Sequence, residues 1–137
     1  MKSLAVIVSK GRTNDFIQVV TLLMAAVHSE LRVRVLFRDE SVLRLTPDAI
    51  NHIELSDAYR AQEPAYRERL KKHELEDLRT LVAQIKASGD VKLYACSSSM
   101  ALAGLKQQDL ITEVDEVRGL PAFLLEDVAQ ADRVLTF

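Results

Sequence analysis

The sequence is poor in several residue types, and each shortage excludes a class of protein. One cysteine is present among 137 residues, so no disulfide can form within the chain, which is typical of proteins of the reducing cytoplasm. Only four glycines and three prolines occur, which excludes collagen-like and low-complexity chains. No apolar run approaches the roughly 20 residues that a membrane-spanning helix needs. We therefore expect a cytoplasmic protein without a membrane span.

Charge of one sign is not concentrated anywhere in the chain. The 18 basic and 20 acidic residues give a net charge of −2, and no tract of lysine and arginine occurs. Nucleic acids and anionic lipids bind to concentrated positive charge, so neither is an expected partner. Hydrophobic residues make up 48% of the chain, which at this length is enough for a core of its own. We expect one domain over residues 1–137.

Strand and helix patterns alternate along the chain. Apolar or alternating runs predict five strands, at 4–9, 32–37, 91–95, 113–117 and 133–137. Apolar residues at helical spacing predict four helices: one that starts at Thr13 or Asn14 and ends at His28, and others at 64–87, 98–108 and 120–129, with loop and short helices over 38–63. Thr13 or Asn14 is expected to cap the first helix, and Gly89 to end the second in a left-handed conformation. The alternation predicts an α/β/α sandwich around a mainly parallel five-stranded sheet.

The single cysteine, Cys96, stands at the carboxyl end of the third predicted strand and directly before a helix. Ligand chemistry in parallel sheets gathers at this edge, because the strand-to-helix loops converge there. The positive end of a helix also stabilises a thiolate, which is the nucleophilic form of cysteine. Ser97, Ser98 and Ser99 follow and supply hydroxyls that could cap the helix or hold a sulfur-bearing ligand. Cys96 is therefore a candidate nucleophile.

Basic side chains follow several of the other strands. Ser9, Lys10 and Arg12 follow the first strand, Arg38 follows the second and Arg118 follows the fourth. The carboxyl ends of parallel strands share one edge, so these residues are expected on the same edge as the thiol. Two such cations near the thiol would favour its anion and a bound persulfide or oxoanion. Lys10, Arg12 and Arg118 are the candidates for this support.

The alternative interpretation is that the cysteine is a small core residue. Cysteine is among the most often buried residue types and packs like a small hydrophobe. Its place at a strand-to-helix junction beside three hydroxyls is not what packing alone requires. On the sequence pattern, the structural and the chemical interpretations weigh about equally.

Other chemistries of cysteine and histidine do not fit the spacing. A phosphatase loop needs an arginine six positions after the cysteine, where Leu102 stands, and a C-x-x-C dithiol needs a second cysteine where Ser99 stands. His28, His52 and His73 have no zinc spacing. The single glycine of the turn SKGRTND is a weak signal for phosphate or flavin. We expect no metal and no organic cofactor.

Residues 91–137 as a whole resemble the DsrE/DsrF-like sulfur-relay family. The resemblance lies in the order of a strand that ends in cysteine, a helix start, a short strand that ends in glycine, an aliphatic helix and a closing strand that ends in phenylalanine. The matching residues are Cys96, Ser99, Met100, Gly104, Val117, Gly119, Phe123, Leu124, Ala129, Ala131 and Phe137.

This resemblance implies a flavodoxin-like sandwich that assembles into homo-oligomers, either trimers or hexamers. In catalytic members the matching cysteine accepts sulfane sulfur as a persulfide and passes it to a partner thiol, so the resemblance implies that role for Cys96. The expected partners are donor and acceptor proteins with reactive thiols. Since the chain has no second cysteine, no internal resolving thiol is available. The alternative is a non-catalytic oligomeric binding module in which Cys96 is structural.

Overall fold

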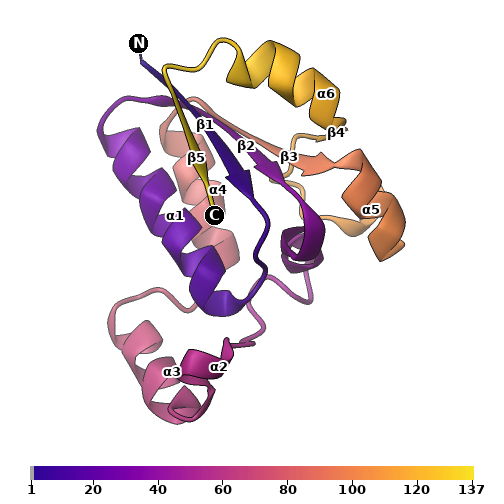
Figure 1. The fold of residues 1–137 in the computed structure, drawn as a ribbon. Helices are drawn as coiled ribbons and strands as arrows, with labels where there is room; N and C mark the ends of the chain where they lie inside the picture. The colour runs from indigo at the N-terminus through magenta and orange to yellow at the C-terminus, as the bar shows by residue number, and fades with distance from the viewer. Residues whose placement is uncertain (1) are drawn as a thin grey trace.

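The computed structural model describes residues 2–137, which form a five-stranded sheet with helices on both sides (Figure 1). The strands are β1 (Ser3–Val8), β2 (Arg32–Phe37), β3 (Val91–Cys96), β4 (Glu116–Arg118) and β5 (Arg133–Thr136). They lie in the order β4-β3-β2-β1-β5, and every neighbouring pair is parallel. The predicted α/β architecture is confirmed.

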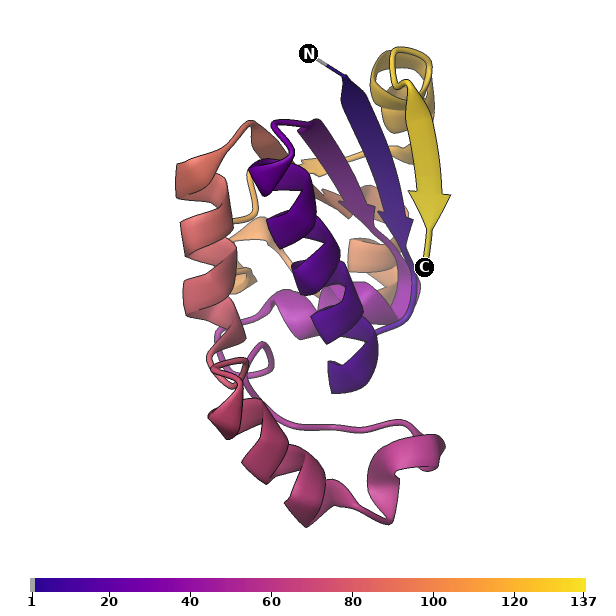
Figure 2. The ribbon, with the colours of Figure 1, turned by 90° about the vertical axis from the view of Figure 1, so that its left-hand side faces the viewer.

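The helices divide between the two faces and one edge of the sheet. Their bounds are α1 (Thr13–His28), α2 (Asp57–Arg60), α3 (Glu63–Lys72), α4 (Leu78–Ser88), α5 (Ser97–Ala103) and α6 (Leu120–Ala122), with the 3-10 helices η1 (Asp39–Leu45) and η2 (Gln107–Asp109) and the π-helical η3 (Phe123–Val128). Helices α1 and α4 lie side by side on one face, and α6 with η3 covers the other (Figure 2). Helices α2 and α3 are set apart from the sheet beyond the start of α1.

The two faces of the sheet differ in how much apolar core covers them, and the alternating side chains of β2 show the difference. Val33 and Val35 are fully buried in the large core under α1 and α4. Arg32 and Arg34 point to the opposite face, where both pair with Asp90. Since successive strand residues point to opposite faces, the pattern RVRV predicts this difference in cover. The second face carries a much smaller apolar cluster.

That smaller cluster contains the single cysteine. Its fully buried members Ala5, Leu36, Cys96 and Phe123 come from β1, β2, β3 and η3, and Tyr94 is nearly buried beside them. The rings of Tyr94 and Phe123 meet edge to face with centroids 6.2 Å apart. Aromatic pairs in this arrangement stabilise a core beyond the area that they bury. The covering segment α6–η3 is therefore held down mainly through Phe123.

The single helix predicted over 64–87 is wrong, because the chain breaks it into α3 and α4. Glu74 adopts a left-handed conformation with φ of 58° between the two. Asp77 caps α4 by accepting a hydrogen bond from the backbone N–H of Thr80 at 3.1 Å. The side-chain oxygen of Asn51 accepts another from the N–H of Leu78 at 2.9 Å. One of these two capping hydrogen bonds therefore comes from a distant loop. The periodicity of apolar residues does not predict such a contact.

The predicted cap of α1 is also wrong. Arg12 is the N-cap residue, and Thr13 is already the first helical residue. The Thr13 hydroxyl accepts a hydrogen bond from the N–H of Glu54 at 2.8 Å, and the Asn14 side chain accepts one from the N–H of Ser56 at 2.9 Å. Both side chains fasten the loop before α2 to the helix, so a tertiary contact replaces the expected local cap.

Two helix ends differ from the prediction at glycines. Gly89 after α4 is extended rather than left-handed, and a Cβ there would lie 3.0 Å from methyl carbons of Val27, so a larger residue would press on that side chain. Gly104 is the left-handed residue, with φ of 71°, and it ends α5 at Ala103, short of the predicted 108. Strand β4 begins at Glu116, later than predicted. None of the helices formed by residues 2–137 is long and apolar enough to cross a membrane.

Candidate functional site

Cys96 is both the last residue of β3 and the N-cap residue of α5. Its side chain is 0% exposed. The sulfur lies 3.3 Å from the hydroxyl oxygen of Ser98, in the first turn of the helix. When the sulfur is a thiolate, it accepts this hydrogen bond. The strand-to-helix junction therefore places a buried sulfur against the first hydroxyls of α5.

The hydrogen bonds around the sulfur change its acidity. Burial raises the pKa of the Cys96 thiol, but hydrogen bonds from the side chains and backbone N–H groups of Ser98 and Ser99 outweigh burial and lower the pKa to about 7. Hydrogen bonds to the charged form favour that form. At neutral pH a large part of Cys96 is therefore the nucleophilic thiolate, whereas an ordinary cysteine, with a pKa of about 8.5, is mostly neutral.

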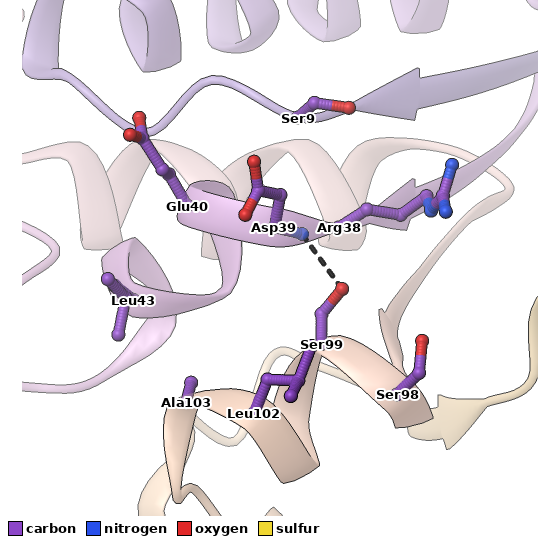
Figure 3. Close-up of a pocket in the computed structure, with 9 residues that line it drawn as sticks. All are labelled: Ser9, Arg38, Asp39, Glu40, Leu43, Ser98, Ser99, Leu102 and Ala103. Atoms are coloured by element: carbon purple, nitrogen blue, oxygen red, sulfur yellow. Dashed lines mark hydrogen bonds between the residues drawn. The ribbon is translucent and has the colours of Figure 1, made fainter.

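The orientation of Ser99 depends on a residue 60 positions earlier in the chain. Its hydroxyl oxygen accepts a hydrogen bond from the backbone N–H of Asp39 at 2.8 Å (Figure 3). The hydroxyl proton of Ser99 is then free to be donated to the thiolate. Asp39 makes this contact from a left-handed conformation with φ of 49°. The turn after β2 and the start of α5 are thus joined beside the sulfur.

A cavity of about 530 Å³ opens at this edge of the sheet. The loops after β1, β2 and β3 all contribute to its wall, as sequence analysis predicts for the carboxyl edge. Its lining consists of Ser9, Arg38, Asp39, Glu40, Leu43, Ser98, Ser99, Leu102 and Ala103 (Figure 3). Two of these side chains are exposed leucines, Leu43 at 52% and Leu102 at 92%. The cavity is polar at the serines and apolar along one wall.

The predicted site residues are only partly brought together. Ser98 and Ser99 contact the sulfur. Ser97 is exposed, and its hydroxyl lies near Gly119: a Cβ added to that glycine would be 3.8 Å from the Ser97 hydroxyl oxygen. Lys10 is exposed. The sequence pattern does not distinguish Ser98 and Ser99 from Ser97, because the difference depends on the helical turn that begins at residue 97.

Arg12 and Arg118 are engaged in ion pairs. Arg12 pairs with Glu54 at a second cavity of about 320 Å³. Arg118 contacts Glu116 at 2.5 Å and Asp127 at 3.2 Å, and it also pairs with Glu126. These carboxylates compete with any anion for the two guanidinium groups. A thiolate-stabilising role for Lys10, Arg12 or Arg118 stays a prediction.

Arg118 nevertheless lies on the face of the sheet that carries the thiol. Its backbone is paired with Cys96 across β3 and β4, and its guanidinium carbon lies 4.7 Å from the centroid of the Tyr94 ring. This is the distance of a cation–π contact. Residues 2–137 contain no group of three or more His, Cys, Asp and Glu side chains placed to hold a metal ion.

Two acidic residues that line the cavity were not among the site residues predicted from the sequence. Asp39 and Glu40 follow Arg38 directly after β2 and line the same wall. Their position after a strand is the one signal that could have pointed to them. The sequence pattern DE is otherwise typical of a solvated surface turn, so the contact of Asp39 with the start of α5 is a finding of the structure.

Comparison with known proteins identifies both a family and a fold. A family model described as the DsrE/DsrF/DrsH-like family matches residues 17–136. The solved structure of a protein of unknown function, MTH1491 from Methanobacterium thermoautotrophicum, is similar with a TM-score of 0.64 and 15% sequence identity, over 98% of this chain and 99% of that one. No curated protein matches. The structural likeness supports the sandwich fold over nearly the whole chain.

Proposed function

Because the chain belongs to the DsrE/DsrF/DrsH-like family, we propose that it is a sulfur carrier that holds sulfane sulfur as a persulfide on Cys96. Membership of the family supports a sulfur-relay role in general. The observation that supports Cys96 as the carrier is the lowered pKa of its thiol, to about 7, beside two serines that line a cavity. A buried cysteine that serves only for packing has a raised pKa.

The proposed reaction is two thiol–disulfide-type exchanges. In loading, the Cys96 thiolate attacks the outer sulfur of a donor persulfide, the sulfur–sulfur bond of the donor breaks, and the donor leaves with the electron pair as a thiolate. In delivery, an acceptor thiolate attacks the terminal sulfur of the Cys96 persulfide and Cys96 leaves as the thiolate. Ser98 and Ser99 donate hydrogen bonds to the sulfur anion at both stages. The reaction needs no second cysteine in this chain and no bound cofactor.

A second candidate function is a non-catalytic binding module with a structural Cys96. The observation that favours it is the complete burial of the Cys96 side chain. The two functions differ in thiol reactivity, since a structural cysteine labels only when the protein unfolds, whereas a carrier thiol reacts in the folded protein near neutral pH.

We also propose that the protein is a cytoplasmic homo-oligomer, either a trimer or a hexamer. Five apolar side chains in η3 and at the end of the chain are between 37% and 76% exposed: Leu124, Leu125, Val134, Leu135 and Phe137. Such a group of exposed apolar residues is typical of an interaction surface. Light scattering that shows only monomer at micromolar concentration would contradict the assembly.

Loading of Cys96 tests the proposed function. Intact-protein mass spectrometry after incubation with thiosulfate or a polysulfide is expected to show a gain of about 32 Da, one sulfur atom, that a reducing thiol removes. Cys96→Ser is expected to show no gain. Ser88→Ala, which removes an exposed hydroxyl on α4, serves as the matched control and should load like the parent. A parent protein that takes up no sulfur, although its thiol can be alkylated in the folded state, would contradict the proposal.

A further inference from the structure

Arg38 directly follows β2, and Cys96 is the last residue of the neighbouring strand β3. The pairing of β2 with β3 joins Leu36 to Tyr94 and Phe37 to Ala95. Arg38 and Cys96 are the next residues of the two segments, so the same register continued by one residue sets them opposite each other. Paired residues of parallel strands point to the same face, so Arg38 and Cys96 share the face that α6 and η3 cover. Arg38 also lines the 530 Å³ cavity.

The backbone of Arg38 is fixed, while its guanidinium group makes no hydrogen bond or ion pair with residues 2–137. Its N–H donates to the carbonyl of Val8 at 2.8 Å, and its carbonyl accepts a hydrogen bond from the hydroxyl of Ser41 at 2.6 Å. Its Nε is buried and has no hydrogen-bond partner among residues 2–137. Buried donors are rarely left without a partner, and each such case calls for an explanation such as a ligand.

The other charged groups near the cavity leave Arg38 available. Arg118, on the opposite side of Cys96, already contacts three carboxylates. Asp39 and Glu40 line the cavity next to Arg38, but their carboxylates point toward the loop that begins at Ser9, whereas the Arg38 guanidinium extends the other way (Figure 3). The cavity therefore has a cationic end, on the side of Ser98.

We propose that Arg38 binds the anionic group of the sulfur donor and makes loading of Cys96 selective for anionic donors. A guanidinium group presents a planar fork of donors that matches the paired oxygens of an oxoanion or a carboxylate. The donor class is thus a sulfane-sulfur compound with a sulfonate or carboxylate close to the transferred sulfur. This inference rests on the proposed role of Cys96 as the sulfur acceptor.

Thiosulfate illustrates the step. The Cys96 thiolate attacks the outer sulfur, the sulfur–sulfur bond of thiosulfate breaks, and sulfite leaves with the electron pair, so that Cys96 becomes a persulfide anion. The sulfur atoms and the charge balance without any other reactant. Arg38 holds the sulfonate oxygens before the step and the sulfite oxygens as their charge grows. An uncharged reagent would gain nothing from the guanidinium group.

The test compares reagents that differ in charge on Arg38→Gln, with Arg60→Gln as the control. Arg60 is an exposed residue of α2, and its substitution makes the same change in net charge. The rates of Cys96 modification are measured with iodoacetate and with neutral iodoacetamide, and the rates of loading with thiosulfate and with cysteine persulfide. Arg38→Gln is expected to slow the iodoacetate and thiosulfate reactions by about tenfold or more, the effect of losing one charged hydrogen bond. The iodoacetamide rate should stay within about twofold.

The outcomes separate this inference from the proposed function. Slower loading by both donors shows that Arg38 also serves donors whose anionic group lies several bonds from the transferred sulfur, and slower loading by thiosulfate alone restricts it to donors whose anionic group is next to that sulfur. Equal slowing of iodoacetate and iodoacetamide, or slowing of neither, would overturn the inference. Alkylation by iodoacetate or iodoacetamide involves no transfer of sulfur, so it tests the anion site independently of the carrier function. A protein that takes up no sulfur, but whose iodoacetate reaction still depends on Arg38, would refute the carrier function and support the anion site.

Discussion

Replacing Phe123 by alanine is expected to lower the free energy of unfolding by about 3–5 kcal/mol. Phe123 is 0% exposed and belongs to the small cluster on the second face of the sheet, where its ring meets Tyr94 edge to face. It is the one residue of α6 and η3 that is fully buried, so its removal leaves a cavity and detaches the segment that covers Cys96. Urea denaturation measures the change.

The matched control is Gln130→Ala, just after the same helical segment. Gln130 is exposed, so removal of its side chain should change the free energy of unfolding by no more than about 0.5 kcal/mol. In Phe123→Ala the thiol of Cys96 is also expected to label faster under native conditions, because local opening of its cover costs less. Similar stability of the two variants would show that the cluster around Cys96 does not hold the helical segment.

Replacing Ser98 and Ser99 together by alanine is expected to raise the pKa of Cys96 from about 7 toward the value of about 8.5 of a free cysteine. The two hydroxyls donate to the thiolate, and without them burial of the sulfur is opposed only by backbone N–H groups. The rate of alkylation by iodoacetamide, measured against pH, reports the midpoint. The pH midpoint of the alkylation rate is the decisive readout, not the rate at one pH. A thiolate of higher pKa is more nucleophilic, which partly offsets its smaller population at neutral pH.

The lowered pKa of Cys96 also makes the free energy of unfolding depend on pH. Since the folded pKa lies below that of the unfolded chain, the thiolate contributes stability above about pH 8.5, and this contribution is lost as the pH falls through about 7. The parent should therefore gain stability over the double variant between these two values. Ser88→Ala is the control and should keep the parent midpoint. A midpoint near 7 in the double variant would show that the hydroxyls do not set the acidity of the thiol.

The strands of the sheet could be predicted from the sequence, whereas some helix boundaries could not. Each strand is a short apolar or alternating run, and that pattern is a local property of the chain. The break between α3 and α4 depends on Asn51, a distant residue whose side chain completes the cap of α4. The cap of α1 depends likewise on contacts that Thr13 and Asn14 make with the loop before α2. Local sequence patterns do not predict such tertiary hydrogen bonds.

The same division applies to the candidate site. The position of Cys96 between a strand and a helix could be predicted, because strand, cysteine and serines are adjacent in the sequence. The contact between Asp39 and Ser99 could not, since it joins a left-handed turn after β2 to the first turn of α5. The pairing of Arg12 with Glu54 is equally hidden, although the predicted edge of the sheet contains Arg12.

Following one labelled sulfur atom through Cys96 tests the carrier function most directly. The protein is loaded with thiosulfate that carries heavy-isotope sulfur in the outer position, freed of excess donor and mixed with glutathione as the acceptor probe. The account predicts that the label leaves the protein, that the mass of the protein returns to that of the free thiol, and that the label appears as glutathione persulfide. Label that stays on the protein, or a Cys96→Ser variant that carries label equally well, would contradict the account.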